Sequence, residues 1–125
     1  MTEETLTTRQ EALLAGLAQH TGTTRWRCHW TRLLLYTDGV AYLADQAGAY
    51  WLIDLVASWQ TEPALRRQGF IVWTLTVNAD RSAVAQATNG NKRSLTRQEI
   101  PATDFPLAEI TLYLTDGVLL LPSEY

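Results

Sequence analysis

The chain has 125 residues, with 10 basic against 13 acidic residues and a net charge of -3. This length is typical of one domain, which buries about two-thirds of its unfolded surface and needs no disulfide or metal to fold. The acidic balance argues against broad, salt-driven attraction to nucleic acid or to an anionic membrane.

The first segment, residues 1–10, is polar and acidic, whereas a secretory signal peptide has a basic start and an apolar run. The single cysteine, Cys28, cannot form a disulfide within the chain, which suits a reducing compartment. The longest apolar stretch, residues 47–57, is interrupted by Asp54 and is too short to cross a bilayer. We therefore expect a cytoplasmic protein with no membrane partner.

Residues 5–19 are predicted to form an amphipathic helix that packs one stripe onto the rest of the domain. The apolar side chains of this stripe recur at helical spacing: Leu6, Leu13, Leu14, Leu17 and Ala18. Gly22 lies just beyond as a stop signal, and His20 suits the negative end of the helix dipole.

Basic and aromatic residues interleave in the next segment, residues 25–32. Its candidate binding residues are Arg25, Trp26, Arg27, His29 and Trp30. In an extended chain the tryptophans point to one face and the arginines to the other. One interpretation places the tryptophans in the core and leaves the arginines solvated. The other makes the segment a contact surface, and the acidic net charge favours a protein over a nucleic acid as its partner.

The tetrapeptide Thr-Asp-Gly-Val occurs twice, at residues 37–40 and at residues 115–118, with leucines on both sides. Asp-Gly suits the positive φ angles of a tight two-residue hairpin turn. Each tetrapeptide therefore predicts a β-hairpin, and the first pairs residues 32–36 with residues 40–43. Convergence on a good turn explains the repetition without an internal duplication.

A second helix is predicted over residues 46–60, with Asp45 as its cap. Nearly every face of this helix is apolar, and Asp54 and Ser58 form a narrow polar strip. Such a helix must be covered all round. It is either the central element of the domain or an element with one face against another subunit.

The remaining chain is predicted to be β-structure. Residues 70–77, 82–88 and 93–99 form a three-stranded meander, and residues 108–114 pair with residues 118–121 in a final hairpin. The last strand is apolar on both faces, which is typical of a strand that is central in its sheet or covered by a partner.

Together these elements predict an α+β fold for residues 1–125, as a single domain. Two main helices pack on an antiparallel β-sheet that is built of hairpins and a meander. The order of elements along the chain is helix, two strands, helix and then five strands.

Two stretches of the chain, residues 33–60 and 103–125, carry a family resemblance. They contain the phrases Tyr-Trp-Leu-Ile-Asp at residues 50–54 and Asp-Phe-Pro-Leu at residues 104–107, and His29 precedes the first stretch. The chain resembles small uncharacterised bacterial proteins, carried by plasmids and phages, that are described as plasmid-related or as a domain of unknown function. The resemblance implies an accessory protein of mobile genetic elements, active in plasmid maintenance or against host defences.

Candidate catalytic and metal-binding groups are few. His29 and Cys28 are sequence neighbours, so they point to opposite faces of an extended segment and cannot form a nucleophile-base pair. His20 adds no spacing that is typical of zinc sites, and the sequence predicts neither a metal nor a cofactor. Asp54 either faces solvent beside Ser58 or is buried and paired, for example with an arginine, and a functional role is the alternative.

These observations support three functions, in order of preference. The first is a non-enzymatic interaction protein that forms a homo-oligomer and also meets a host protein. The second is a nucleic-acid or nucleotide-binding module, in which Arg66 and Arg67 assist the segment at residues 25–32. The third is an enzyme, which requires His29 or Asp54 in a concave pocket beside a second polar group.

Overall fold

The computed structural model describes residues 3–19, 25–91 and 93–125. Its helices are α1 (Glu3–Ala18), α2 (Asp38–Ala47), α3 (Tyr50–Trp59), α4 (Pro63–Arg66) and the short 3-10 helix η1 (Pro122–Glu124). Its strands are β1 (Trp26–Cys28), β2 (Leu35–Thr37), β3 (Phe70–Val77), β4 (Ala83–Thr88), β5 (Ser94–Ile100), β6 (Glu109–Thr115) and β7 (Val118–Leu120).

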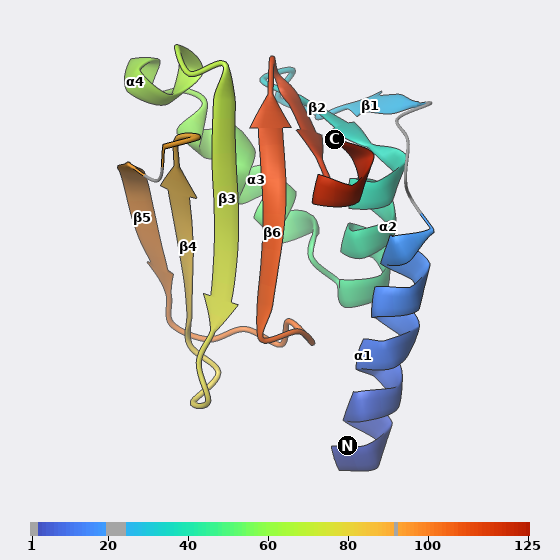
Figure 1. Cartoon of the computed structure of the whole chain (residues 1–125). Coiled ribbons are helices and arrows are strands. Elements are labelled where there is room, and N and C mark those ends of the chain that lie inside the picture. Colours follow the sequence, from blue (N-terminus) through green and yellow to red (C-terminus); the bar gives the residue numbers. More distant parts are fainter. Residues whose placement is uncertain (1–2, 20–24, 92) are drawn as a thin grey trace.

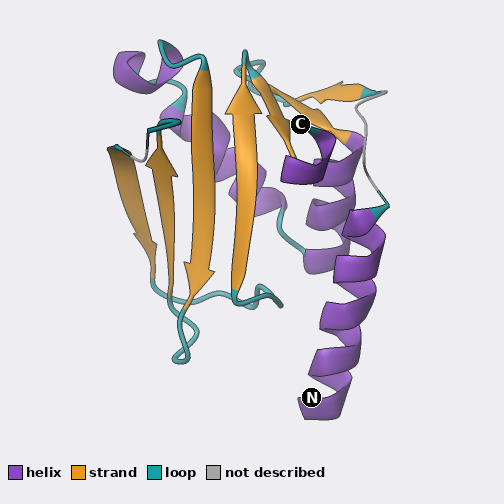
Figure 2. Ribbon diagram, viewed as in Figure 1, coloured by secondary structure: helices purple, strands orange, loops and turns teal. Residues whose placement is uncertain are grey.

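The seven strands form one sheet in the order β1-β2-β7-β6-β3-β4-β5 (Figure 1). All neighbours are antiparallel except β2 and β7, which run parallel. Helices α2 and α3 cover one face of the sheet, and α1 packs against α2 (Figures 1 and 2). The expected α+β class is confirmed, although the main helices number three rather than two.

The C-terminal β-structure agrees with the sequence. Strands β3, β4 and β5 form the expected meander, and β6 and β7 form the expected hairpin. In β3 the side chains of Ile71, Trp73 and Leu75 are buried, whereas those of the alternate residues lie on the opposite, partly exposed face. The first helix is confirmed, and Leu13 and Leu17 of its expected apolar stripe are buried, whereas Leu14 and Ala18 are exposed. His20 and Gly22 lie outside the described residues.

Helix α3 is the central element of the core. Its apolar residues Leu52, Ile53, Leu55, Val56 and Ala57 are all buried within the chain. Strand β7 lies between β2 and β6 in the sheet, and its residues Leu119 and Leu120, which point to opposite faces, are both buried within the chain. The apolar side chains of α3 and β7 named above are therefore buried within one molecule. In the part of the chain that the structure describes, no helix has the length and apolar character needed to span a membrane.

The expected first hairpin, pairing residues 32–36 with residues 40–43, is wrong. Thr37 is the N-cap of α2: its hydroxyl oxygen accepts a hydrogen bond from the Val40 N–H at 3.2 Å. The Thr37 hydroxyl also donates to Glu124 Oε1 at 2.6 Å, and both side chains are buried. A Cβ atom at Gly39 would lie 2.6 Å from Glu124 Oε1, so any side chain at this position would displace the carboxylate. The hairpin that does form joins β1 to β2.

The expected second helix over residues 46–60 is also wrong, because the segment contains parts of two helices. Helix α2 ends at Ala47, and its C-cap Gly48 adopts the left-handed conformation with φ 63°. Asp45 lies inside α2 and caps nothing, and α3 begins only at Tyr50. The left-handed residue turns the chain, so α3 leaves in a new direction and crosses the sheet.

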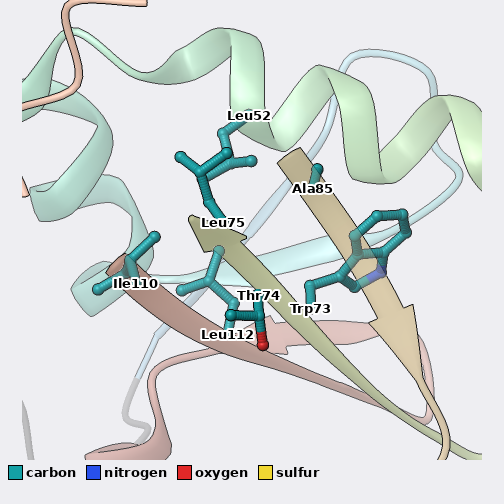
Figure 3. Close-up of a pocket in the computed structure, with 7 residues that line it drawn as sticks. All are labelled: Leu52, Trp73, Thr74, Leu75, Ala85, Ile110 and Leu112. Atoms are coloured by element: carbon teal, nitrogen blue, oxygen red, sulfur yellow. The ribbon is translucent and has the colours of Figure 1, made fainter. Parts of the chain in front are cut away.

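A small apolar gap lies between α3 and the sheet (Figure 3). Leu52, Leu75 and Ala85 are among its lining residues, and the gap is too small for a water molecule. The buried indole N–H of Trp73, which lines the same gap, has no hydrogen-bond partner. The gap is therefore a packing feature of the core and has no room for a ligand.

Candidate functional site

The loop between β1 and β2 carries the most exposed tryptophan of the described chain. The backbone N–H of His29 donates to the Leu34 carbonyl at 3.0 Å, and that of Arg32 donates to the His29 carbonyl at 2.8 Å. Arg32 has a positive φ of 63°. These bonds give residues 29–34 one defined conformation. We call this segment the Trp30 loop.

His29 is the buried centre of the loop, with 4 % of its surface exposed. Its Nδ1 accepts from the Thr31 backbone N–H at 3.2 Å and lies 2.7 Å from the Thr31 hydroxyl. Its Nε2 lies 2.6 Å from Asp54 Oδ1. Since Nδ1 accepts a hydrogen bond, the network assigns the ring proton to Nε2, which donates to the carboxylate.

Asp54 lies on the outer surface of α3, and its Oδ1 accepts two hydrogen bonds. The second comes from the Trp30 indole N–H at 3.1 Å. The Asp54 side chain remains 53 % exposed. The carboxylate therefore faces solvent and is paired, with a histidine and a tryptophan rather than with an arginine. Ser58, the other residue of the polar strip, donates to the Leu55 carbonyl.

The expected core position of the tryptophans is wrong. Trp26 is 55 % exposed and Trp30 is 79 % exposed, whereas His29 is buried. The reason is that β1 is the edge strand of the sheet and all three of its residues are exposed, so the face that carries Trp26 is not covered by the core. Trp30 follows in the loop beyond β1. The opposite placement of Cys28 and His29 is confirmed, because Cys28 is exposed.

The arginines of this region are exposed and only partly paired. Arg27 Nε lies 3.4 Å from Asp38 Oδ1. In the described part of the chain, the guanidinium groups of Arg25 and Arg32 have no hydrogen-bond or ion-pair partner. Arg66 and Arg67 are exposed on and after α4, on the side of the sheet away from β1 (Figure 1). The structure thus separates the two basic segments.

A tyrosine-aspartate pair continues the surface along α3. Tyr50 precedes Asp54 by one helical turn, and its hydroxyl donates to Asp45 Oδ1 at 2.7 Å. This hydrogen bond, together with partial burial and the negative charge of Asp45, raises the pKa of the Tyr50 hydroxyl above its usual range. The surface therefore combines two aromatic rings with two carboxylates, those of Asp45 and Asp54.

His29 and Asp54 bring two groups suited to acid-base chemistry together on the surface. A hollow of about 380 Å³ lies beside the ends of β4 and β5, and one of about 270 Å³ lies between α1 and η1. His29 and Asp54 line neither of these two hollows of the described chain. Among the described residues, no group of three potential metal ligands occurs.

Sequence reasoning identified His29 and Asp54 but did not connect them. They are 25 residues apart, and no local pattern links a loop histidine to a helical aspartate. Thr31 was missed, although a threonine two residues after a polar side chain is a common local hydrogen-bond partner. Tyr50 was also missed. Its spacing of four residues from Asp54 is the signal that places both on one helix face.

Comparison with known proteins gives one match. A model described as a family of unknown function (DUF6876) matches residues 11–125. Neither the curated proteins nor the solved structures contain a match.

Proposed function

The chain belongs to this family of unknown function, and we propose that it is a non-enzymatic interaction protein that self-associates through the Trp30 loop. The observation that carries the proposal is the exposed Trp30 ring, whose indole N–H is held by a hydrogen bond to Asp54. Tryptophan is enriched among the residues that dominate binding energy at protein interfaces. A ring that is already immobilised loses little conformational entropy on binding.

Charge complementarity supports a second molecule of the same chain as the partner. Three arginines and three aspartates lie in this region: Arg25, Arg27, Arg32, Asp38, Asp45 and Asp54. Only one arginine-aspartate ion pair forms among these described residues, between Arg27 and Asp38. The surface therefore offers unpaired charges of both signs, as a two-fold contact between identical surfaces requires.

The experiment is light scattering coupled to size-exclusion chromatography, from low to high micromolar protein. We expect the mass of the native chain to rise toward twice that of one molecule. Trp30→Ala should weaken the association about 30-fold, which corresponds to a hot spot of about 2 kcal/mol. Tyr125→Ala is the matched control, because Tyr125 is an aromatic residue with a similar exposure of 73 %. A native chain that stays monomeric at every concentration contradicts the proposal.

Nucleic-acid binding is the second candidate, supported by the exposed rings of Trp26 and Trp30 beside exposed arginines. The nearby carboxylates of Asp38, Asp45 and Asp54 weigh against it, because they repel phosphates. Tryptophan fluorescence with a single-stranded oligonucleotide separates the two functions. Quenching that weakens steeply with added salt supports nucleic-acid binding, whereas unchanged fluorescence removes it.

We place this role in the cytoplasm, as an accessory factor of mobile genetic elements that also meets a host protein. The sequence resemblance to plasmid-related proteins supports the genetic context. The single cysteine, which forms no disulfide within the chain, supports the compartment. Binding of a purified candidate host protein that is lost in Trp30→Ala and kept in Tyr125→Ala would identify the same surface as the host contact.

A further inference from the structure

We propose that Arg32 of one molecule binds the Asp54 carboxylate and the Trp30 ring of a second molecule. This inference rests on the proposed self-association and names its central contact. It starts from the backbone of Arg32. Three non-glycine residues of the described chain have positive φ: Arg32 at 63°, Arg81 at 70° and Asp116 at 49°. L-residues other than asparagine and aspartate rarely adopt this conformation.

All three residues lie in tight turns of hairpin loops, which explains their conformation. Asp116 is the first central residue of the β6-β7 turn. Arg32 and Arg81 each end a turn, in which their backbone N–H groups donate to the carbonyls of His29 at 2.8 Å and Asn78 at 3.0 Å. The two arginines differ in their side chains. The Arg81 guanidinium donates to the carbonyls of Thr103 and Phe105, whereas the exposed guanidinium of Arg32 contacts no partner among the described residues. The turn therefore fixes the Arg32 backbone and leaves its guanidinium available to a second molecule.

The matching acceptor lies on the same surface. Asp54 Oδ1 is occupied by His29 and Trp30, and Oδ2 has no hydrogen-bond partner within the described chain. A carboxylate oxygen beside an exposed indole ring suits a guanidinium, which combines an ionic hydrogen bond with a cation-π contact. His29 fixes the acceptor, since its Nε2 holds Oδ1 at 2.6 Å.

A two-fold arrangement of two molecules forms the same contact twice. Within one molecule Arg32 and Asp54 form no ion pair with each other. Arg32 belongs to the Trp30 loop, and the Trp30 indole of the same loop donates to Asp54. Across a two-fold axis, Arg32 of each molecule meets Asp54 of the other, so two identical contacts form at once. The two Trp30 rings then lie at the centre of the interface, where hot-spot residues concentrate.

A charge swap tests the contact. Arg32→Asp and Asp54→Arg each place like charges opposite one another, and we expect each variant alone to associate at least tenfold more weakly than the native chain. An equimolar mixture restores two opposite-charge pairs in the mixed dimer, and the double variant Arg32→Asp/Asp54→Arg restores them in one chain. Native mass spectrometry distinguishes the mixed dimer from the two homodimers. Arg66→Asp is the matched control, because Arg66 is an exposed arginine away from the loop.

The outcomes separate this inference from the proposed function. Mixed dimers that are tighter than both homodimers support the contact. Native-like association of Arg32→Asp, with Trp30→Ala still defective, overturns the contact and leaves self-association intact. A monomeric native chain removes both. Because Asp54→Arg also removes the partner of His29, circular dichroism verifies its fold. Arg32→Ala, which leaves the His29-Asp54-Trp30 hydrogen bonds untouched, repeats the test with an expected weakening of about tenfold.

Discussion

The same four residues, Thr-Asp-Gly-Val, start a helix at residues 37–40 and turn a hairpin at residues 115–118. In the first tetrapeptide Thr37 is extended and caps α2. In the second, Asp116 and Gly117 have φ of 49° and 82°, the signs that a two-residue hairpin turn requires. Identical local sequence thus leads to two conformations.

The residues after each tetrapeptide decide between the two conformations. Residues 41–47, after the first, are Ala-Tyr-Leu-Ala-Asp-Gln-Ala, which are mostly good helix formers. The three leucines and the proline after the second, residues 119–122, suit a short strand that ends. The tertiary contact between Thr37 and Glu124 then fixes the helix start. Asp-Gly signals a change of direction, and the surrounding chain selects its form.

The largest expected difference in the free energy of unfolding is between substitutions at Thr37 and at Thr115. Thr37→Val removes the helix cap and leaves Glu124 without its hydroxyl donor. We expect a loss of about 3 kcal/mol in the free energy of unfolding. Thr115→Val should change it by less than about 0.5 kcal/mol, because valine suits a strand. Urea denaturation of both variants measures the contrast. Equal effects would show that the buried Thr37-Glu124 contact does not stabilise the helix start.

Substitutions at Gly39 and Gly117 should differ less in their effect on stability. In an ordinary helix Gly→Ala stabilises, but Gly39→Ala places a methyl group 2.6 Å from Glu124 Oε1 and should destabilise by about 2 kcal/mol. Gly117→Ala meets no atoms and suffers only from its positive φ, at about 1 kcal/mol. Thermal denaturation compares the two. A stabilising Gly39→Ala would contradict the close approach of the carboxylate.

The aspartates should respond with opposite signs. Asp116→Asn improves a turn that favours Asn-Gly and should stabilise by about 0.5 kcal/mol. Asp38→Asn loses a negative charge in the first turn of α2 and should destabilise by about 0.5 kcal/mol, an effect that shrinks with added salt. Chemical denaturation at low and high salt measures both changes. Stabilisation by both substitutions would indicate that the first tetrapeptide is a turn.

The smallest expected effect is a pH-dependent change in stability that involves Asp45 in α2, the helix that the first tetrapeptide starts. Asp45 in α2 accepts the Tyr50 hydroxyl and raises its pKa. A raised pKa contributes stability below the unfolded value of about 10, and that contribution is lost as pH rises through the folded pKa. We expect the native chain to melt slightly above Tyr50→Phe at pH 8, and this difference to vanish in strong base. A constant difference would exclude the linkage.

The fold was predictable wherever the pattern of apolar residues is long and regular. In β3 the buried residues Ile71, Trp73 and Leu75 alternate with less buried ones, and their buried face is the predicted one. The boundary between α2 and α3 was not found, because the apolar run across Ala47 and Ala49 hides a break at Gly48. The helix-period burial of Val40, Leu43 and Ala47 was available in the sequence, and the turn signal of Asp-Gly obscured it.

The candidate site was predictable as a set of residues and not as an arrangement. The segment at residues 25–32 was identified from its arginines and tryptophans, and the exposed Trp30 lies there. The burial of His29 and the exposure of Trp26 and Trp30 depend on the position of β1 at the edge of the sheet, which the sequence of a three-residue strand does not indicate. The contact with Asp54 depends on how α3 crosses the sheet. Such long-range geometry leaves no local trace in a single sequence.

The hydrogen bond from Thr37 to Glu124 spans 87 residues and has a consequence for biosynthesis. A ribosome releases residue 37 long before residue 124, and the parallel partner of β2, β7, also arrives late. The nascent protein therefore carries β2 and the start of α2 without their permanent neighbours for most of translation. We expect these elements to acquire native protection only after β7 and η1 have emerged from the ribosome.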